Sequence, residues 1–159
     1  MRVVVTLEQR FDRTPDGAVW TWSDFSYVFW QRYLEIFDRV QVVASVRDVA
    51  SVPPTYKRSD GVQADFSPIP AYQGPSQFLW VAPKIVRSIR ASVGKRDAVI
   101  MRIGSMLATC LEPYLSSMHH PYGVEVVGDP FDVFAPGAIR HPLRPVFRRW
   151  FTRTQKRQC

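Results

Sequence analysis

The chain has 159 residues, which fits one domain, and its 46% hydrophobic and 22% charged residues are an ordinary globular balance. No apolar run approaches the roughly 18 residues that span a bilayer, the acidic Glu8 comes too early for a signal peptide, and two cysteines are too few for a disulfide framework. The net charge of +7 is carried by the last twenty residues, because the first 139 contain 14 basic and 14 acidic side chains.

The first third of the chain predicts two strands and one helix. Residues 2–8 and 40–46 are rich in β-branched side chains, which favours strands. Between them, residues 9–23 predict a long polar and aromatic loop with a Pro-Asp-Gly turn. Ser23 or Asp24 can cap the helix that follows. The apolar stripe of this helix has helical spacing and consists of Trp30, Tyr33, Leu34 and Phe37.

The rest of the chain alternates strands with helices. The predicted strands are 62–69, 97–103 and 122–127. The predicted helices begin near 74, 107 and 141, with Pro83 and Pro113 inside the first two. This alternation implies βαβ units with right-handed crossovers. We therefore expect an α/β fold with a parallel Rossmann-like sheet and helices on both faces. Residues 1–139 form the predicted domain, and residues 140–159 form a basic amphipathic helix or linker.

The carboxyl ends of the predicted strands are where such sheets bind ligands. One end carries Glu8, followed by the 9–23 loop, which is longer than the usual two to six residues. The loop holds Arg10, Asp16, Gly17 and Trp22. Aromatic faces stack on sugar rings, and charged groups hydrogen-bond hydroxyls. We therefore expect ligand contacts here; the alternative is a surface hairpin whose tryptophans pack on the domain.

Two further strand ends offer candidate side chains. Asp129 follows the last predicted strand and could accept a proton from an acceptor hydroxyl, although Gly-Asp-Pro is also a turn sequence. Arg102 lies within an apolar strand and needs a partner. It could bind a phosphate, but a pair with Glu125 of the neighbouring strand is the better-supported interpretation.

Several classes of site are disfavoured. No G-x-G-x-x-G turn follows the first strand and no phosphate-binding P-loop occurs, which argues against dehydrogenases, nucleotide-sugar epimerases and P-loop enzymes. His119 and His120 have no further histidine or cysteine at ligand spacing, so we expect no metal site. We expect no cofactor either.

The chain resembles the N-terminal domain of bacterial GT-B glycosyltransferases of the family-4 type, which build capsular and cell-surface polysaccharides. The stretches that carry the resemblance are 7–11, 15–20, 27–38, 101–105 and 124–130. The resemblance implies two Rossmann-like domains that face each other across a cleft. The first domain binds the acceptor, the second binds most of the nucleotide-sugar donor, and no metal is required.

The resemblance also sets the expected site. Many relatives carry a histidine at a strand end in the first domain, where this chain has Gly128 and Asp129. No catalytic histidine can therefore be carried over from the family. Asp129 is the candidate catalytic residue because of its place after the last predicted strand. The predicted substrate-binding residues are Glu8, Arg10, Asp16, Gly17, Trp22, Arg102 and Asp129.

These observations predict the acceptor-binding half of a glycosyltransferase, inactive alone, with a donor-binding domain supplied elsewhere. Its acceptor would be a glycan or a lipid-linked sugar. The alternative is a non-catalytic α/β binding module whose basic tail holds an anionic partner. The two cysteines fit a reducing compartment, so we expect a cytoplasmic protein. The tail between Arg140 and Arg157 suits an anionic membrane surface on the inner leaflet, and the alternative is that its apolar face docks onto its own domain. No nucleic-acid partner is expected, since the excess charge lies in one terminal segment without a nucleic-acid motif.

Overall fold

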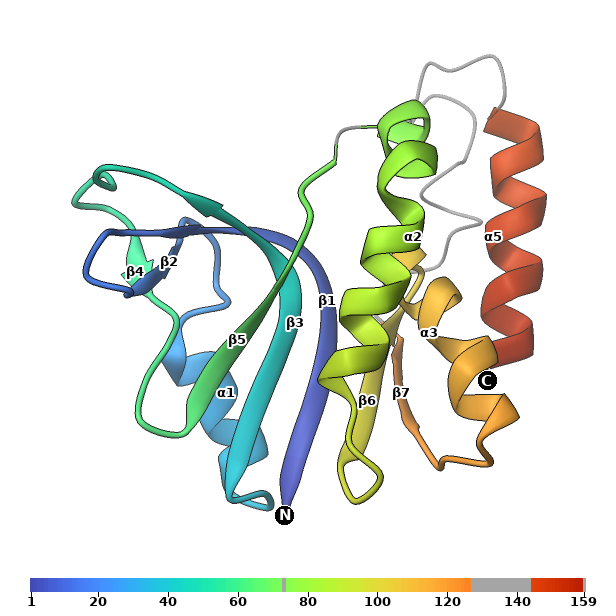
Figure 1. Ribbon diagram of the computed structural model, residues 1–159, viewed down its shortest axis with the longest axis horizontal. Helices are drawn as coiled ribbons and strands as arrows, with labels where there is room; N and C mark the ends of the chain where they lie inside the picture. The colour runs from blue at the N-terminus through green and yellow to red at the C-terminus, as the bar shows by residue number, and fades with distance from the viewer. Residues whose placement is uncertain (73, 127–143, 159) are drawn as a thin grey trace.

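The computed structural model describes residues 1–72, 74–126 and 144–158 (Figure 1). The strands of this part of the chain are β1 (Arg2–Arg13), β2 (Val19–Thr21), β3 (Arg39–Asp48), β4 (Lys57–Arg58), β5 (Ala64–Ile69), β6 (Ala98–Ile103) and β7 (Gly123–Val126). The helices are α1 (Tyr27–Leu34), α2 (Gly74–Ser92), α3 (Met106–Ser117) and α5 (Arg144–Gln158). The boundary predicted at residue 139 lies outside the described residues.

The strands form one mixed sheet with β1 at its centre. β1 pairs in parallel with β3 on one side and with β6 on the other. β5 extends the sheet beyond β3, and β7 extends it beyond β6, both in parallel. β2, however, pairs antiparallel with β1, and β4 pairs antiparallel with β2. The prediction of a parallel Rossmann-like sheet is therefore wrong, because two antiparallel strands belong to the same sheet.

Strand β2 comes from the segment that was predicted as a loop, whereas β4 lies between β3 and β5. β1 does not end near Glu8 but continues to Arg13, and the chain then turns back into β2. Aromatic and β-branched residues in this segment favour extended backbone. The Pro-Asp-Gly sequence closes the hairpin: Gly17 has a φ of 87° and donates its N–H to the Thr14 carbonyl oxygen at 2.9 Å. The 9–23 segment is thus mainly a β-hairpin, seen at the left of Figure 1.

Ion pairs stabilise the far half of β1 against β3. The Arg47 guanidinium donates to the Asp12 carboxylate at 2.9 Å, and Arg13 donates to Asp48 at 2.7 Å. Both pairs join residues in register across the two parallel strands. Asp12 is buried, so its charge requires this partner. Charged side chains are therefore compatible with a strand here because each has an opposite charge across the ladder.

The helices cover both faces of the sheet (Figure 1). α1 contributes Trp30 and Tyr33 to a core formed with β1 and β3. α2 and α3 pack on the other face, where Ile85, Ile89 and Leu111 are fully or almost fully buried. The helix that carries the predicted aromatic stripe is shorter than its spacing suggested. It begins after Ser26, whose side chain makes no capping hydrogen bond, rather than at Ser23 or Asp24.

The C-terminal helix lies beside α3. Arg157 of α5 donates a hydrogen bond of 2.5 Å to the buried Glu112 carboxylate of α3. Phe147 and Phe151 are half-buried, so part of the apolar face of α5 is covered. Among the described residues, no helix combines the length and apolar character that crossing a membrane requires.

Trp30 is the largest fully buried side chain of the α1 face. Its indole N–H donates to the Ser59 hydroxyl at 3.1 Å, and its ring meets Phe29 edge-on with centroids 4.9 Å apart. We expect Trp30→Ala to lower the free energy of unfolding by roughly 3–5 kcal/mol, because it leaves a cavity and removes the hydrogen bond to Ser59. Urea denaturation measures the change. Val28→Ala, at an exposed position of the same helix, should stay within about 0.5 kcal/mol; equal effects of the two variants would contradict this packing.

Candidate functional site

A hollow opens where β1 separates from its neighbours. β1 pairs with β6 only from Val3 to Thr6, and its pairing with β3 shifts register between Thr6 and Arg10. Leu7, Glu8 and Gln9 therefore have no register partner in either parallel ladder. These residues line a hollow of about 320 Å³, within the size range of small-molecule sites. It lies beside the middle of β1 and β3, both of which continue past it, and next to Ile69, the last residue of β5.

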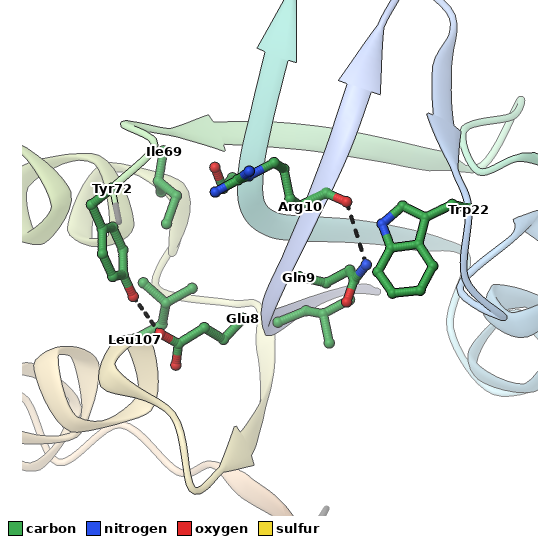
Figure 2. Close-up of a pocket in the computed structure, with 9 residues that line it drawn as sticks. Glu8, Gln9, Arg10, Trp22, Ile69, Tyr72 and Leu107 are labelled. Carbon is green, nitrogen blue, oxygen red and sulfur yellow. Dashed lines mark hydrogen bonds between the residues drawn. The ribbon is translucent and has the colours of Figure 1, made fainter. Parts of the chain in front are cut away.

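Glu8 accepts the hydrogen bonds that join the parts of one wall of the hollow. Its carboxylate accepts the backbone N–H of Met106, the first residue of α3, at 2.7 Å. It also accepts the hydroxyl of Tyr72, which lies just before α2 (Figure 2). A carboxylate at a helix N-terminus is stabilised by the unpaired N–H groups and the helix dipole. Glu8 therefore connects β1 to the starts of two helices.

Burial alters the acidity of two side chains around Glu8. Burial, together with the hydrogen bond to the Glu8 carboxylate, raises the pKa of Tyr72 well above its ordinary value. Burial and the charge of Glu8 also raise the pKa of the Cys110 thiol. Tyr72 thus acts as a hydrogen-bond donor, and the raised pKa of Cys110 favours its protonated thiol.

The opposite wall is open and mixed in chemistry. Trp22, which follows β2, has 67% of its surface exposed and lies across from Tyr72 beside the Gln9 side chain (Figure 2). Arg10 extends its guanidinium toward Ile69. Ser45 of β3 completes the polar lining. An exposed indole next to amide, guanidinium and hydroxyl groups is suited to a ligand that is both ring-shaped and rich in hydroxyls.

Three of the predicted substrate-binding residues thus meet in the hollow: Glu8, Arg10 and Trp22. Two others have a local role in the hairpin. The Asp16 carboxylate accepts the Thr14 hydroxyl and the Ala18 N–H at 3.2 Å, and these hydrogen bonds lower its pKa. Gly17 forms the turn itself. Neither lines the hollow at Glu8, although Gly17 borders a separate surface depression beside Asp48 and Val49.

Arg102 lies on the other face of the sheet, beneath α1. Its guanidinium carbon is 4.8 Å from the centre of the Phe25 ring, and its Nε is 3.6 Å from a Glu125 carboxylate oxygen. Glu125 is the residue opposite Arg102 on β7. The predicted pair with Glu125 is therefore confirmed, and Arg102 does not share the hollow with Glu8.

The Glu125 carboxylate is the centre of a polar network under α1. It accepts hydrogen bonds from Arg32 at 2.7 Å and from the Tyr33 hydroxyl at 2.8 Å. Burial opposes its charge, but these hydrogen bonds and the charge of Arg102 outweigh burial and lower the pKa of Glu125. Burial and the same carboxylate raise the pKa of Tyr33. This network is a structural link between α1, β6 and β7.

The remaining predicted residue, Asp129, lies outside the described residues, so its role stays a prediction. The hollow also includes residues that the sequence did not indicate: Leu7, Gln9, Ser45, Ile69, Tyr72 and Leu107. Gln9 fell within the predicted ligand loop, and Ile69 ends a predicted strand. Tyr72 had no sequence signal, because its role depends on the distant Glu8.

Comparison with known proteins finds one partial similarity. The chain is 32% identical over 110 residues to protein CapJ of Staphylococcus aureus. The match covers 69% of this chain but 28% of CapJ, so the chain spans less than a third of this relative. No protein-family model matches the chain, and no solved structure matches it. The resemblance to family-4 glycosyltransferases therefore stays a prediction.

The raised pKa of Tyr72 has a measurable consequence. Tyr72 should keep its proton through the range near pH 10 in which an ordinary tyrosine ionises. Its contribution to stability is then complete below that range and declines as the pH rises, because the unfolded chain loses the proton first. Phenolate absorbance of the native protein, compared with that of Tyr72→Phe, should show no difference below about pH 10. A difference that titrates near the ordinary value would disprove the hydrogen bond to Glu8.

Proposed function

We propose that this chain is the acceptor-binding part of a family-4 type glycosyltransferase, which moves a sugar from a nucleotide-sugar to a glycan or lipid-linked acceptor. The observation that carries the proposal is the hollow between Trp22 and the Glu8–Tyr72 pair. The name of the relative CapJ supports a place in capsule biosynthesis, where sugar transfer is the repeated chemical step. The nucleotide-sugar is the second substrate, and the proposal includes no cofactor.

The hollow is suited to positioning an acceptor rather than to proton transfer. The Glu8 carboxylate already accepts two hydrogen bonds, from Tyr72 and from the N-terminus of α3. A base must be free to take a proton from the reacting hydroxyl, so we assign Glu8 to the support of the site. Asp129 remains the candidate base.

Arg10 and Trp22 act on the acceptor itself in this proposal. The exposed indole of Trp22 offers a flat apolar face on which a sugar ring can stack. The guanidinium of Arg10 can donate several hydrogen bonds to hydroxyl or acidic groups of the same ligand. Neither residue is buried in the core, so replacing either one should change binding without unfolding the domain.

The first test is acceptor binding by the chain. Oligosaccharides from a capsular polysaccharide, titrated while amide NMR signals are followed, should shift signals of residues around the hollow. Trp22→Ala and Arg10→Ala should each weaken binding roughly tenfold, because a stacking surface or a charged donor is lost. Val62→Ala and Arg39→Ala, at exposed positions outside the hollow, are the matched controls. Binding that is equally strong in all four variants would exclude this hollow as the acceptor site.

The second test concerns the donor. We expect the chain to bind UDP- or GDP-sugars weakly or not at all, because the proposal assigns most donor contacts to a second domain. Isothermal titration calorimetry checks this, and micromolar donor affinity would contradict the assignment. A donor-hydrolysis screen on the full-length gene product separates the enzyme from the alternative, a non-catalytic binding module: no hydrolysis with any nucleotide-sugar would favour the binding module.

A further inference from the structure

The outer face of α2 exposes two large apolar side chains next to each other. Trp80 is 87% exposed and Leu79 is 73% exposed, whereas their neighbour Phe78 is buried against the sheet. Single exposed apolar residues are common on protein surfaces. An adjacent pair with a tryptophan exposes more contiguous apolar surface than a single residue, and large exposed apolar surfaces mark sites of contact with other molecules or membranes.

The same face of α2 is basic. Trp80, Lys84 and Arg87 follow one another at spacings of four and three residues, which aligns them along one side of the helix. Arg90 is also exposed, on the side toward α3, where its guanidinium carbon lies 5.1 Å from the centre of the Tyr114 ring. The sequence of α2 contains no acidic residue. The turn after α2 continues this charge with exposed Lys95 and Arg96.

The neighbouring helix layer has the same sign of charge. α3 separates α2 from α5 and carries Glu112 as its acidic residue, which is paired with Arg157 (Figure 1). α5 contains six basic residues and no acidic one in its sequence from 144 to 158. Potentials from charges within about one Debye length of each other add at the surface. The helices on this side of the sheet therefore form a positive surface from which Trp80 and Leu79 protrude.

We propose that the outer face of α2 docks on an anionic lipid bilayer, with Trp80 and Leu79 inserted at the interface and Lys84 and Arg87 against the lipid headgroups. Tryptophan favours the membrane interface because its ring is apolar while its N–H is polar. Basic side chains beside it gain from the negative surface potential of the lipid. A nucleic acid would use the charges but would leave the apolar Leu79 in water, so the bilayer fits both features of this face.

The position of this face has a consequence for the hollow. Tyr72 precedes α2, and Trp80 lies six residues after the first residue of the helix, about 9 Å along its axis. Docking would thus place the start of α2, and with it one wall of the hollow, near the lipid surface. The proposal itself rests on α2 and does not require that the hollow bind a sugar.

The experiment is flotation of the complete chain with vesicles of phosphatidylglycerol and phosphatidylcholine in equal parts, compared with pure phosphatidylcholine. The chain should float with the anionic vesicles at low salt and be released at high salt. Leu79→Ala/Trp80→Ala and Lys84→Glu/Arg87→Glu should each reduce the partition coefficient at least about tenfold. Equal flotation with neutral and anionic vesicles, or no flotation with either, would overturn the proposal.

Matched variants separate this face from general effects. Ile36→Ala removes a 77% exposed apolar side chain after α1, and Arg39→Glu/Lys57→Glu reverses two charges outside the helix layer; both should bind as the unchanged protein does. Brominated lipids should quench tryptophan fluorescence, and Trp80→Phe should remove most of the quenching. Sedimentation velocity without lipid tests the alternative occupant. A dimer that Leu79→Ala/Trp80→Ala dissociates would overturn the proposal in favour of a protein interface.

Discussion

The separation of β1 from β6 after Thr6 is the constraint on which the site depends. Up to that residue β1 is the centre of the sheet, with a parallel neighbour on each side. Beyond it, β1 follows β3 alone and then turns back into β2. The three residues between these two parts of β1, Leu7, Glu8 and Gln9, have no register partner in either parallel ladder, and they line the hollow. Glu8 compensates for part of the lost pairing, because its carboxylate takes the first N–H of α3 and the hydroxyl of Tyr72.

The local sequence signals located most elements, and they failed where charged residues occur within a strand. β3, β5, β6 and β7 coincide with predicted strands because their β-branched or apolar residues dominate. The far half of β1 has the sequence Arg-Phe-Asp-Arg, which by itself favours a loop. It is a strand because Asp12 and Arg13 meet Arg47 and Asp48 in register on β3. That pairing joins segments 35 residues apart in the chain, so no local pattern could predict it, and the expected fold class failed for the same reason.

The sequence predicted part of the candidate site, although Glu8 and Arg10 lie within β1 rather than at its end. It did not predict on which face of the sheet each side chain lies. Glu8, Arg10 and Trp22 do meet. Arg102 is near the end of β6, yet it lies under α1 while Met101 and Ile103 pack on the face of α2 and α3. Side chains alternate between the two faces along a strand. The apolar neighbours Met101 and Ile103 therefore already indicated that Arg102 points to the opposite face. Asp16 illustrates the opposite problem, because a carboxylate in a turn is often satisfied by the turn itself.

The distribution of charge shows how the two faces of the molecule differ. A count of charged residues from 1 to 139 suggests a neutral domain with a basic tail. In the structure, however, the charges of this domain are distributed unevenly between the hairpin side and the helix side. Around the hairpin, Asp12 and Asp48 neutralise arginines across the β1–β3 ladder, and Asp60 neutralises Arg58. α2 has no acidic residue of its own to neutralise Lys84 and Arg87. The strands therefore hold their charges in internal pairs, while the helix layer directs a positive potential outward. Among the described residues, the outward positive charge of the helix layer thus begins at α2, well before the C-terminal helix.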